Sequence, residues 1–153
     1  MLLNKLMKSY IKGINKSDHI QQVAPTWCSF TLWEDCVLLE NSLKNVTLPE
    51  SFSAMRYDDR TSIEADFNHL HMNTLFTQEV TPVSLLQSAL SLLNEWERKL
   101  KAEYPERSFH LILSYDGDDV VVRFYGLRES ELPWIDIDNL ENYKLEGVLV
   151  KII

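Results

Sequence analysis

A chain of 153 residues with 45% hydrophobic and 25% charged residues has the size and composition of one folded domain. Residues 1–16 carry four lysines and no acid, whereas residues 17–153 hold 11 basic and 23 acidic side chains, for a net charge of −8 overall. Such an acidic body repels phosphate backbones, which argues against direct nucleic-acid binding. No apolar run approaches the roughly 20 residues of a membrane-spanning helix.

The N-terminal residues and the cysteines predict a soluble protein of the cytoplasm. Lysines are spread through Met1 to Ser17, without the continuous apolar stretch and cleavage site of a secretory signal. Cys28 and Cys36 are the only cysteines, and two thiols do not make a disulfide framework in a domain of this size.

The first predicted element is a helix that ends near Gly13 to Ser17. Its apolar residues recur at three- and four-residue spacing along one face. They are Leu2, Leu3, Leu6, Met7, Tyr10, Ile11 and Ile14. The width of this face predicts docking on the acidic domain, and a membrane-surface anchor or transit peptide is the alternative.

Four strands are predicted next. The segment Trp27 to Glu40 is rich in aromatic and β-branched residues and is interrupted at Glu34-Asp35, which indicates two strands or one bent strand. A second pair is expected from Phe52 to Tyr57 and from Ile63 to Phe67, where apolar and polar residues alternate.

The second half of the chain has clearer signals. Thr81-Pro82 predicts an N-cap and first position of a long helix that stops before Pro105. Asp116-Gly117-Asp118-Asp119 predicts a hairpin between strands 109–115 and 120–127, and Asp138 is expected to cap a short helix before a last strand at 148–153. The order predicts an α+β fold, with a largely antiparallel sheet and both the long and the N-terminal helix on one side.

A metal site is one hypothesis for the histidines. His69 and His71 lie two apart and could share a metal with His110, His19 or Glu64, but no strong ligand motif accompanies them. Ordinary polar residues at a strand end are the preferred interpretation. The spacing of Cys28 and Cys36 fits no ligand or redox motif either, so we expect no bound metal.

Acidic residues give no catalytic pattern. The Asp116 to Asp119 run lacks the spread of oxygen donors of a calcium loop and is interpreted as a turn. Glu64 and Asp66 could be an acid/base pair on one strand face, but a solvated face is preferred because no nucleophile is positioned nearby. Nucleophile elbows and glycine-rich phosphate loops are missing, so neither catalytic residues nor cofactors are predicted.

The most distinctive surface feature is the acidic segment from Asp116 to Asp138, whose net charge is −5. Trp134 follows Pro133 where no periodicity demands a core residue, and we predict that it anchors a basic protein partner. Packing of Trp134 as a lid on the core is the alternative. The predicted partner-binding residues are Asp116, Asp118, Asp119, Glu129, Glu131, Trp134, Asp136 and Asp138.

In size, acidity, layout and lack of catalytic motifs, the whole chain resembles the immunity proteins of bacterial toxin/immunity systems. The resemblance implies a cytoplasmic inhibitor that masks a toxin, often a nuclease whose basic groove an acidic surface can occupy. One alternative is an enzyme or small-ligand binder with a pocket between the sheet and the long helix, around His69, His71 and Tyr115. Another is a structural subunit of a larger assembly.

Overall fold

The computed structural model describes residues 1–14 and 20–153. Lys16, expected in the basic first helix, and His19, considered as a metal ligand, lie outside these residues. The α-helices are α1 (Lys5–Lys12), α2 (Arg60–Phe67) and α3 (Pro82–Glu103). The strands are β1 (Leu2–Leu3), β2 (Phe30–Trp33), β3 (Cys36–Leu39), β4 (Leu70–His71), β5 (Phe109–Tyr115), β6 (Val120–Gly126) and β7 (Gly147–Ile152). Short 3-10 helices are η1 (Pro25–Cys28), η2 (Glu40–Leu43), η3 (Phe52–Ala54), η4 (Met72–Leu75) and η5 (Ile137–Asn142).

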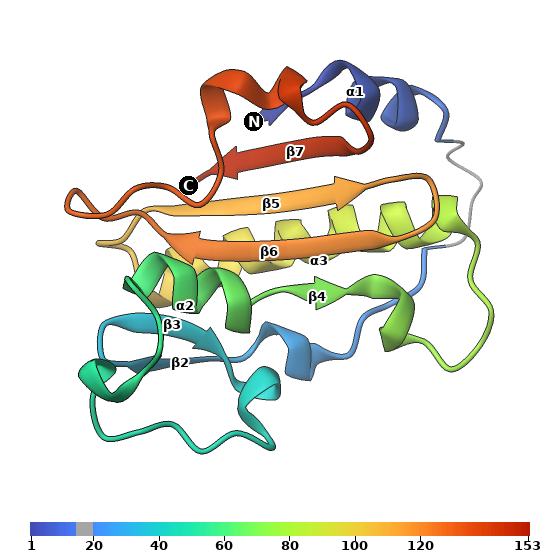
Figure 1. Cartoon of the computed structure of the whole chain (residues 1–153). Coiled ribbons are helices and arrows are strands. Elements are labelled where there is room, and N and C mark those ends of the chain that lie inside the picture. Colours follow the sequence, from blue (N-terminus) through green and yellow to red (C-terminus); the bar gives the residue numbers. More distant parts are fainter. Residues whose placement is uncertain (15–19) are drawn as a thin grey trace.

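Two sheets organise the described residues (Figure 1). The five-stranded sheet has the order β1-β7-β5-β6-β4, and every neighbouring pair in it is antiparallel. Strands β2 and β3 form a separate antiparallel hairpin. The predicted α+β fold with a largely antiparallel sheet is therefore confirmed.

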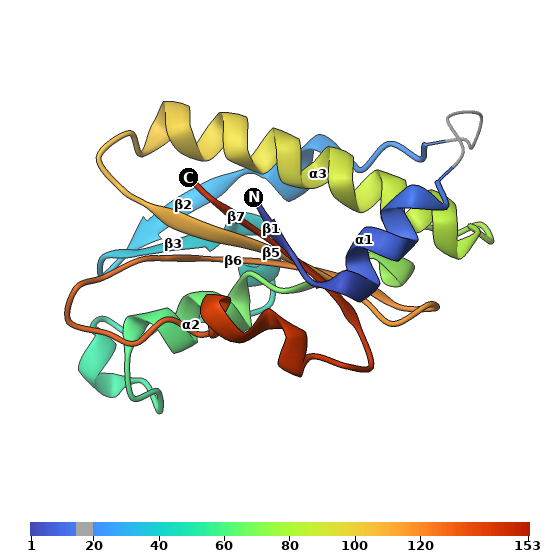
Figure 2. The same ribbon diagram turned by 90° about the horizontal axis from the view of Figure 1, so that it is seen from above.

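Helices pack on both faces of the large sheet, but they cover the second face only in part (Figure 2). The long helix α3 lies along one face, and α2 and η5 lie on the opposite face. Met7 of α1 is buried in the same core cluster as Trp96 of α3 and Phe124 of β6, so the long and N-terminal helices share one side as predicted. A second, smaller cluster forms beneath α2 and η5 and includes Tyr125 and Ile135.

The first helix begins later than predicted, because Leu2 and Leu3 pair with β7 as strand β1. Asn4 ends this strand and caps the helix. Its buried Oδ1 accepts hydrogen bonds from the backbone N–H groups of Met7 and Val148, and its Nδ2 donates to the carbonyl oxygens of Tyr143 and Glu146. One side chain thus joins β1, α1 and β7. Local sequence patterns cannot predict this connection, because Asn4 and Val148 are far apart in the sequence.

The predicted strand pair at 52–57 and 63–67 is wrong. Residues Phe52–Ala54 form η3, and Arg60–Phe67 form helix α2. The N-cap Asp59 accepts a hydrogen bond from the backbone N–H of Ser62 at 2.7 Å, which helps to fix the start of the helix. The helix has only eight residues, about two turns, and in so short a segment apolar and polar residues can alternate without forming a strand.

Helix α2 inserts side chains between the hairpin and the large sheet. Glu64 accepts hydrogen bonds from the backbone N–H groups of Val37 in β3, at 2.7 Å, and Gly126 in β6, at 2.6 Å. Asn68, one turn later, bonds Val37 and Leu39 in β3 and the carbonyl of Phe124 in β6. These two buried side chains satisfy edge groups that another strand would otherwise satisfy.

The remaining predicted elements are close to those observed. Thr81 caps α3 through the N–H of Ser84, and Trp27 to Glu40 contains two strands joined at Glu34-Asp35. Both turn residues have positive φ, 48° and 70°, as a tight two-residue hairpin turn requires. The predicted cap Asp138 lies inside η5, whose N-cap is Asp136.

Candidate functional site

Part of the sheet face opposite α3 is left uncovered between α2 and η5. Val120, Val122 and Phe124 of β6 point into the α3 core, so the alternating residues Val121 and Arg123 point the other way. Strand pairing places His71 of β4 beside Val121 and on the same side. We call this area, lined by His71, Val121, Arg123 and the adjoining Trp134, the front face.

Trp134 is the most prominent aromatic residue of the front face. Its side chain is 47% exposed, and the guanidinium carbon of Arg123 lies 3.9 Å from the centre of its ring. The neighbouring Ile135, only 2% exposed, is the residue of this segment that packs into the core. The alternative of Trp134 as a core lid is therefore not what the structure shows, and its ring remains half available for contact.

Arg123 has an unusual environment for an arginine. In the described part of the chain, no hydrogen bond or ion pair involves its guanidinium, and the Trp134 ring is its only ring contact. Burial lowers the pKa of Arg123, and the more distant charges of Asp66 and Glu146 oppose that shift. The front face therefore holds a partly desolvated cation whose donors are unused.

The rings of His69 and His71 lie close together, as their spacing suggested, and within the described residues no further metal ligand joins them. The ring centroids of His69 and His71 are 5.5 Å apart. His71 Nδ1 lies 2.9 Å from a carboxylate oxygen of Asp119. Among residues 1–14 and 20–153, no group of three or more His, Cys, Asp or Glu side chains is arranged to hold a metal ion.

The other proposed ligands and the proposed acid/base pair lie elsewhere. Glu64 is fully buried in a bidentate ion pair with Arg128, at 2.9 and 3.0 Å, so the expectation of a solvated strand face is wrong for it. Asp66 faces outward and accepts a hydrogen bond from the Tyr57 hydroxyl. The two carboxylates diverge because positions two apart on an α-helix point about 200° from each other.

His110 is buried against Tyr125, with 2.7 Å between His110 Nδ1 and the tyrosine hydroxyl. Burial lowers the pKa of His110 below its ordinary value of 6.5. The unfolded chain therefore binds a proton more readily than the native state, and the stabilisation present above pH 6.5 is lost as pH falls through the lowered pKa.

We expect the free energy of unfolding to fall between pH 7 and pH 5, and the fall to be smaller in His110→Gln. Denaturant titrations at several pH values measure this, with His71→Gln as the control because His71 is exposed. Carboxylates such as Glu97, whose pKa is lowered to about 2, lose their contribution only at lower pH. An equal pH dependence in His110→Gln and the wild type would contradict the prediction.

The predicted acidic residues are distributed over two ends of the β5–β6 hairpin. Asp116, Asp118 and Asp119 form its turn, whereas Glu129 and Glu131 follow β6, so a strand of about 20 Å separates the groups. They do not form one cluster. Asp136 and Asp138 lie at the start of η5.

Three of these acids have structural roles. Glu131 is largely buried and accepts hydrogen bonds from the N–H groups of Arg60 and Thr61 at the start of α2. Asp116 accepts from two N–H groups within its turn, and Asp136 caps η5. Asp118, Glu129 and Asp138 remain exposed and are the better candidates for partner contact.

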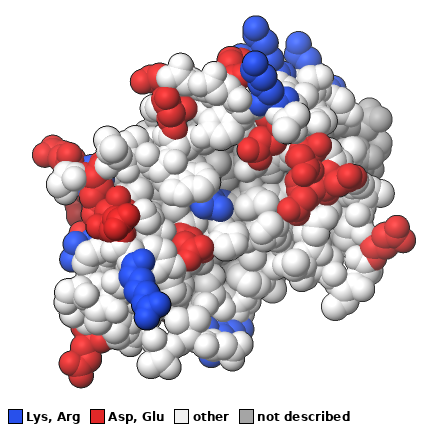
Figure 3. Space-filling model, viewed as in Figure 1, with Lys and Arg blue, Asp and Glu red and all other residues white. Residues whose placement is uncertain are grey.

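The charge distribution of this side of the molecule is visible in Figure 3. Acidic side chains form several separate groups across the view, and basic ones lie at the α1 end, at the lower left, near the lower edge, and in a small area near the middle. Arg123 of β6 is the residue that places a positive charge on the uncovered sheet. The face is thus acidic with a basic centre, which the total charge of the segment does not reveal.

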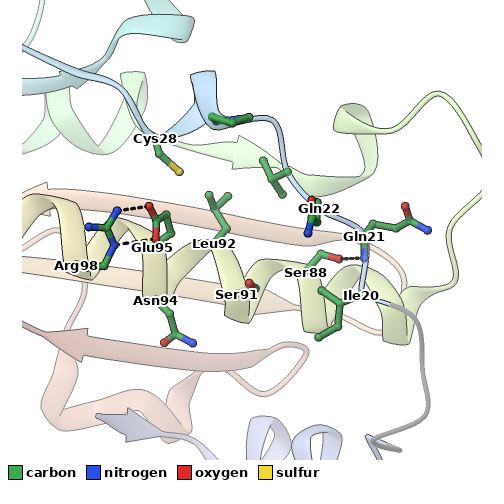
Figure 4. Close-up of a pocket in the computed structure, with 12 residues that line it drawn as sticks. Ile20, Gln21, Gln22, Cys28, Ser88, Ser91, Leu92, Asn94, Glu95 and Arg98 are labelled. Carbon is green, nitrogen blue, oxygen red and sulfur yellow. Dashed lines mark hydrogen bonds and ion pairs between the residues drawn. The ribbon is translucent and has the colours of Figure 1, made fainter.

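A groove of about 490 Å³ lies elsewhere, between α3 and the segment 20–28 (Figure 4). Ser91, Asn94 and the ion pair of Glu95 with Arg98 line one side, and Gln22 lies on the other. This is not the pocket predicted around His69, His71 and Tyr115. Tyr115 is buried on the α3 side of the sheet, where it packs edge-on to Tyr10.

Neither cysteine has the environment of a reactive thiol. Both thiols are buried, Cys28 at one end of the groove and Cys36 in β3. Burial is the main cause that raises the pKa of Cys28, and it raises the pKa of Cys36 to about 12. The thiolate that a nucleophile or metal ligand requires is therefore disfavoured at both positions.

The fold and the front face define a small α+β domain in which helices cover one side of an antiparallel sheet and leave part of the other side uncovered. The chain belongs to the Uncharacterized protein PM0498 family, which it matches over residues 2–152. No curated protein and no solved structure matches it. Of the helices in the described residues, none combines the length and apolar character needed to cross a membrane.

Proposed function

We propose that this protein binds a basic protein partner through the front face and its acidic surroundings. A cytoplasmic inhibitor of the immunity type, which masks the surface of a toxin, is the function that we infer. The observation that best supports this proposal is that Trp134 is half exposed and contacts Arg123 within an acidic face. Trp and Arg are the residue types most often found at the energetic centre of protein interfaces.

Charge supports the choice of partner. Asp118, Glu129 and Asp138 are exposed around the front face and attract a basic surface over several ångströms. The same acids disfavour nucleic acid as a direct ligand, because they repel its phosphates. A nuclease with a basic substrate groove has the complementary chemistry.

The proposal is tested by recovering protein partners from the source organism with the purified chain. Binding of the leading candidate is then measured over a salt series. We expect rising salt to slow association much more than it speeds dissociation, because screening acts on separated charges and less on a desolvated contact. Failure to recover any partner, or a salt-independent association rate, would contradict the proposal.

Two kinds of variant separate steering from anchoring. Asp118→Lys with Glu129→Lys should slow association, whereas Glu103→Lys, an exposed charge near the end of α3, serves as the control. Trp134→Ala should mainly speed dissociation, with a loss of roughly 2 kcal/mol. Glu131 is left unchanged in this series because its replacement would disturb the start of α2.

The groove beside α3 supports a second candidate, a small-ligand binder. Its volume of about 490 Å³ is within the range of ligand pockets, and amide and hydroxyl groups line it. Screening by thermal shift distinguishes the two functions: a compound that stabilises the wild type but not Ser91→Trp would favour ligand binding in the groove.

A further inference from the structure

The charges of the front face have a definite order across the sheet. Arg123 lies on β6, Asp66 lies on α2, and Glu146 lies just before β7. Because β7 and α2 are on opposite sides of β6, the order is acidic, basic, acidic. Both carboxylates are near enough to act on the charge of Arg123, yet neither forms an ion pair with it.

The donors of Arg123 are available to a ligand. The guanidinium carbon lies over the Trp134 ring, 3.9 Å from its centre, and no hydrogen bond among the described residues uses the N–H groups of this side chain. Asp66, the α2 acid whose charge acts on Arg123, already accepts a hydrogen bond from Tyr57 and lies 3.9 Å from His69 Nδ1. Arg123 is thus a planar, forked donor at the centre of the face, with one side shielded by Trp134.

We propose that Arg123 receives one carboxylate of the bound protein, flanked on that partner by basic side chains that face Asp66 and Glu146. This inference rests on the proposed function and specifies the charge pattern of the partner. An arginine binds a carboxylate through two parallel charge-assisted hydrogen bonds. A lysine in place of Arg123 could not form this forked pair, and an uncharged amide in place of the partner's carboxylate could not form it either.

A uniformly basic partner fits the face less well. Closing such a surface over Arg123 would desolvate the guanidinium beside other cations and leave its donors without acceptors. The central carboxylate removes this penalty, so it distinguishes the true partner from basic proteins in general.

The test uses two pentapeptides with acetylated and amidated ends, Lys-Lys-Glu-Lys-Lys and Lys-Lys-Gln-Lys-Lys. Attraction to the net acidic chain alone favours the glutamine peptide, because it lacks the negative charge of glutamate and its net charge is therefore one unit more positive. We expect the reverse: the glutamate peptide should bind about threefold more tightly or better, because it forms a charge-assisted pair with Arg123. Titrations followed by NMR of the labelled protein, including the Arg123 side-chain Nε–H, measure both affinities.

Arg123→Lys and Arg123→Gln should each remove the preference for glutamate, and circular dichroism checks that both variants fold. The control is Lys101→Gln, which removes a positive charge from α3 on the other side of the sheet and should keep the preference. Equal binding, tighter binding of the glutamine peptide, or no binding of either peptide to the wild type would overturn the inference.

The outcomes also separate this inference from the proposed function. Salt-dependent binding of a recovered partner, together with no peptide preference, would leave the proposed function standing and remove only the role of Arg123. A clear glutamate preference without any recovered partner would support the carboxylate site and count against the partner.

Discussion

Replacing Glu64 with glutamine should lower the free energy of unfolding by about 3–5 kcal/mol, the usual cost of breaking one buried ion pair. Glu64 is fully buried, and its two oxygens accept hydrogen bonds from Arg128, Val37 and Gly126. Each oxygen accepts two of these bonds, and an amide cannot accept at both ends, so the substitution removes the nearest counter-charge of Arg128 and turns two of the four bonds into donor–donor contacts.

Arg128 shows the strength of this interaction. Burial alone would lower the pKa of Arg128, but its hydrogen bonds to Glu64 and the charge of that carboxylate raise it overall. The guanidinium also donates to the backbone carbonyl of Asp35, so the pair connects the tip of the β2–β3 hairpin to α2 and β6. Loss of Glu64 should therefore loosen three elements together.

Urea titration measures the effect, with Glu103→Gln as the control for an exposed helical glutamate. The double variant Glu64→Gln with Arg128→Met should cost less than the two single variants added together, because it removes both charges of the pair. Unchanged stability of Glu64→Gln would show that the carboxylate is not buried as described.

Replacing Trp96 with alanine should also cost about 3–5 kcal/mol, through the loss of a large core side chain. Trp96 is fully buried on α3, packs edge-on to Phe124 of β6, and donates from Nε1 to the carbonyl of Trp27 at 2.8 Å. The variant would create a cavity between helix and sheet and would leave that carbonyl without its partner.

Trp134→Ala is the matched control for Trp96→Ala. Trp134 is 47% exposed and lies outside the core clusters of the described residues, so its loss should change stability by about 1 kcal/mol or less. Denaturant midpoints of the two variants give the comparison. A Trp96→Ala midpoint equal to that of the wild type would mean that another face of α3 contacts the sheet.

Only part of the front face was predictable from the sequence. Trp134 stood out because it follows a proline where neither helical nor strand periodicity places a core residue. The sequence does not identify Arg123 as a residue of this face. Its exposure depends on what covers β6, and its lack of an ion pair depends on where Asp66 and Glu146 lie. These residues are up to 80 positions apart, and no spacing rule connects them.

Where a local signal is strong, the sequence by itself determined the element. Thr81-Pro82 and the apolar repeat after it define α3, and the Asp116 to Asp119 turn defines the β5–β6 hairpin, because capping and turn geometry act over a few residues. Antiparallel pairing in an α+β domain followed from the order of such elements.

Tertiary structure decided the rest, and segment 60–68 is the clearest case. Its alternating pattern is compatible with a strand, but as a helix it directs Glu64 and Asn68 into the gap between β3 and β6, where backbone groups need partners. Asn4 acts similarly by ending a predicted helix early in favour of β1. Both outcomes depend on hydrogen bonds to distant strands, so burial of those polar groups, rather than local propensity, determined the structure.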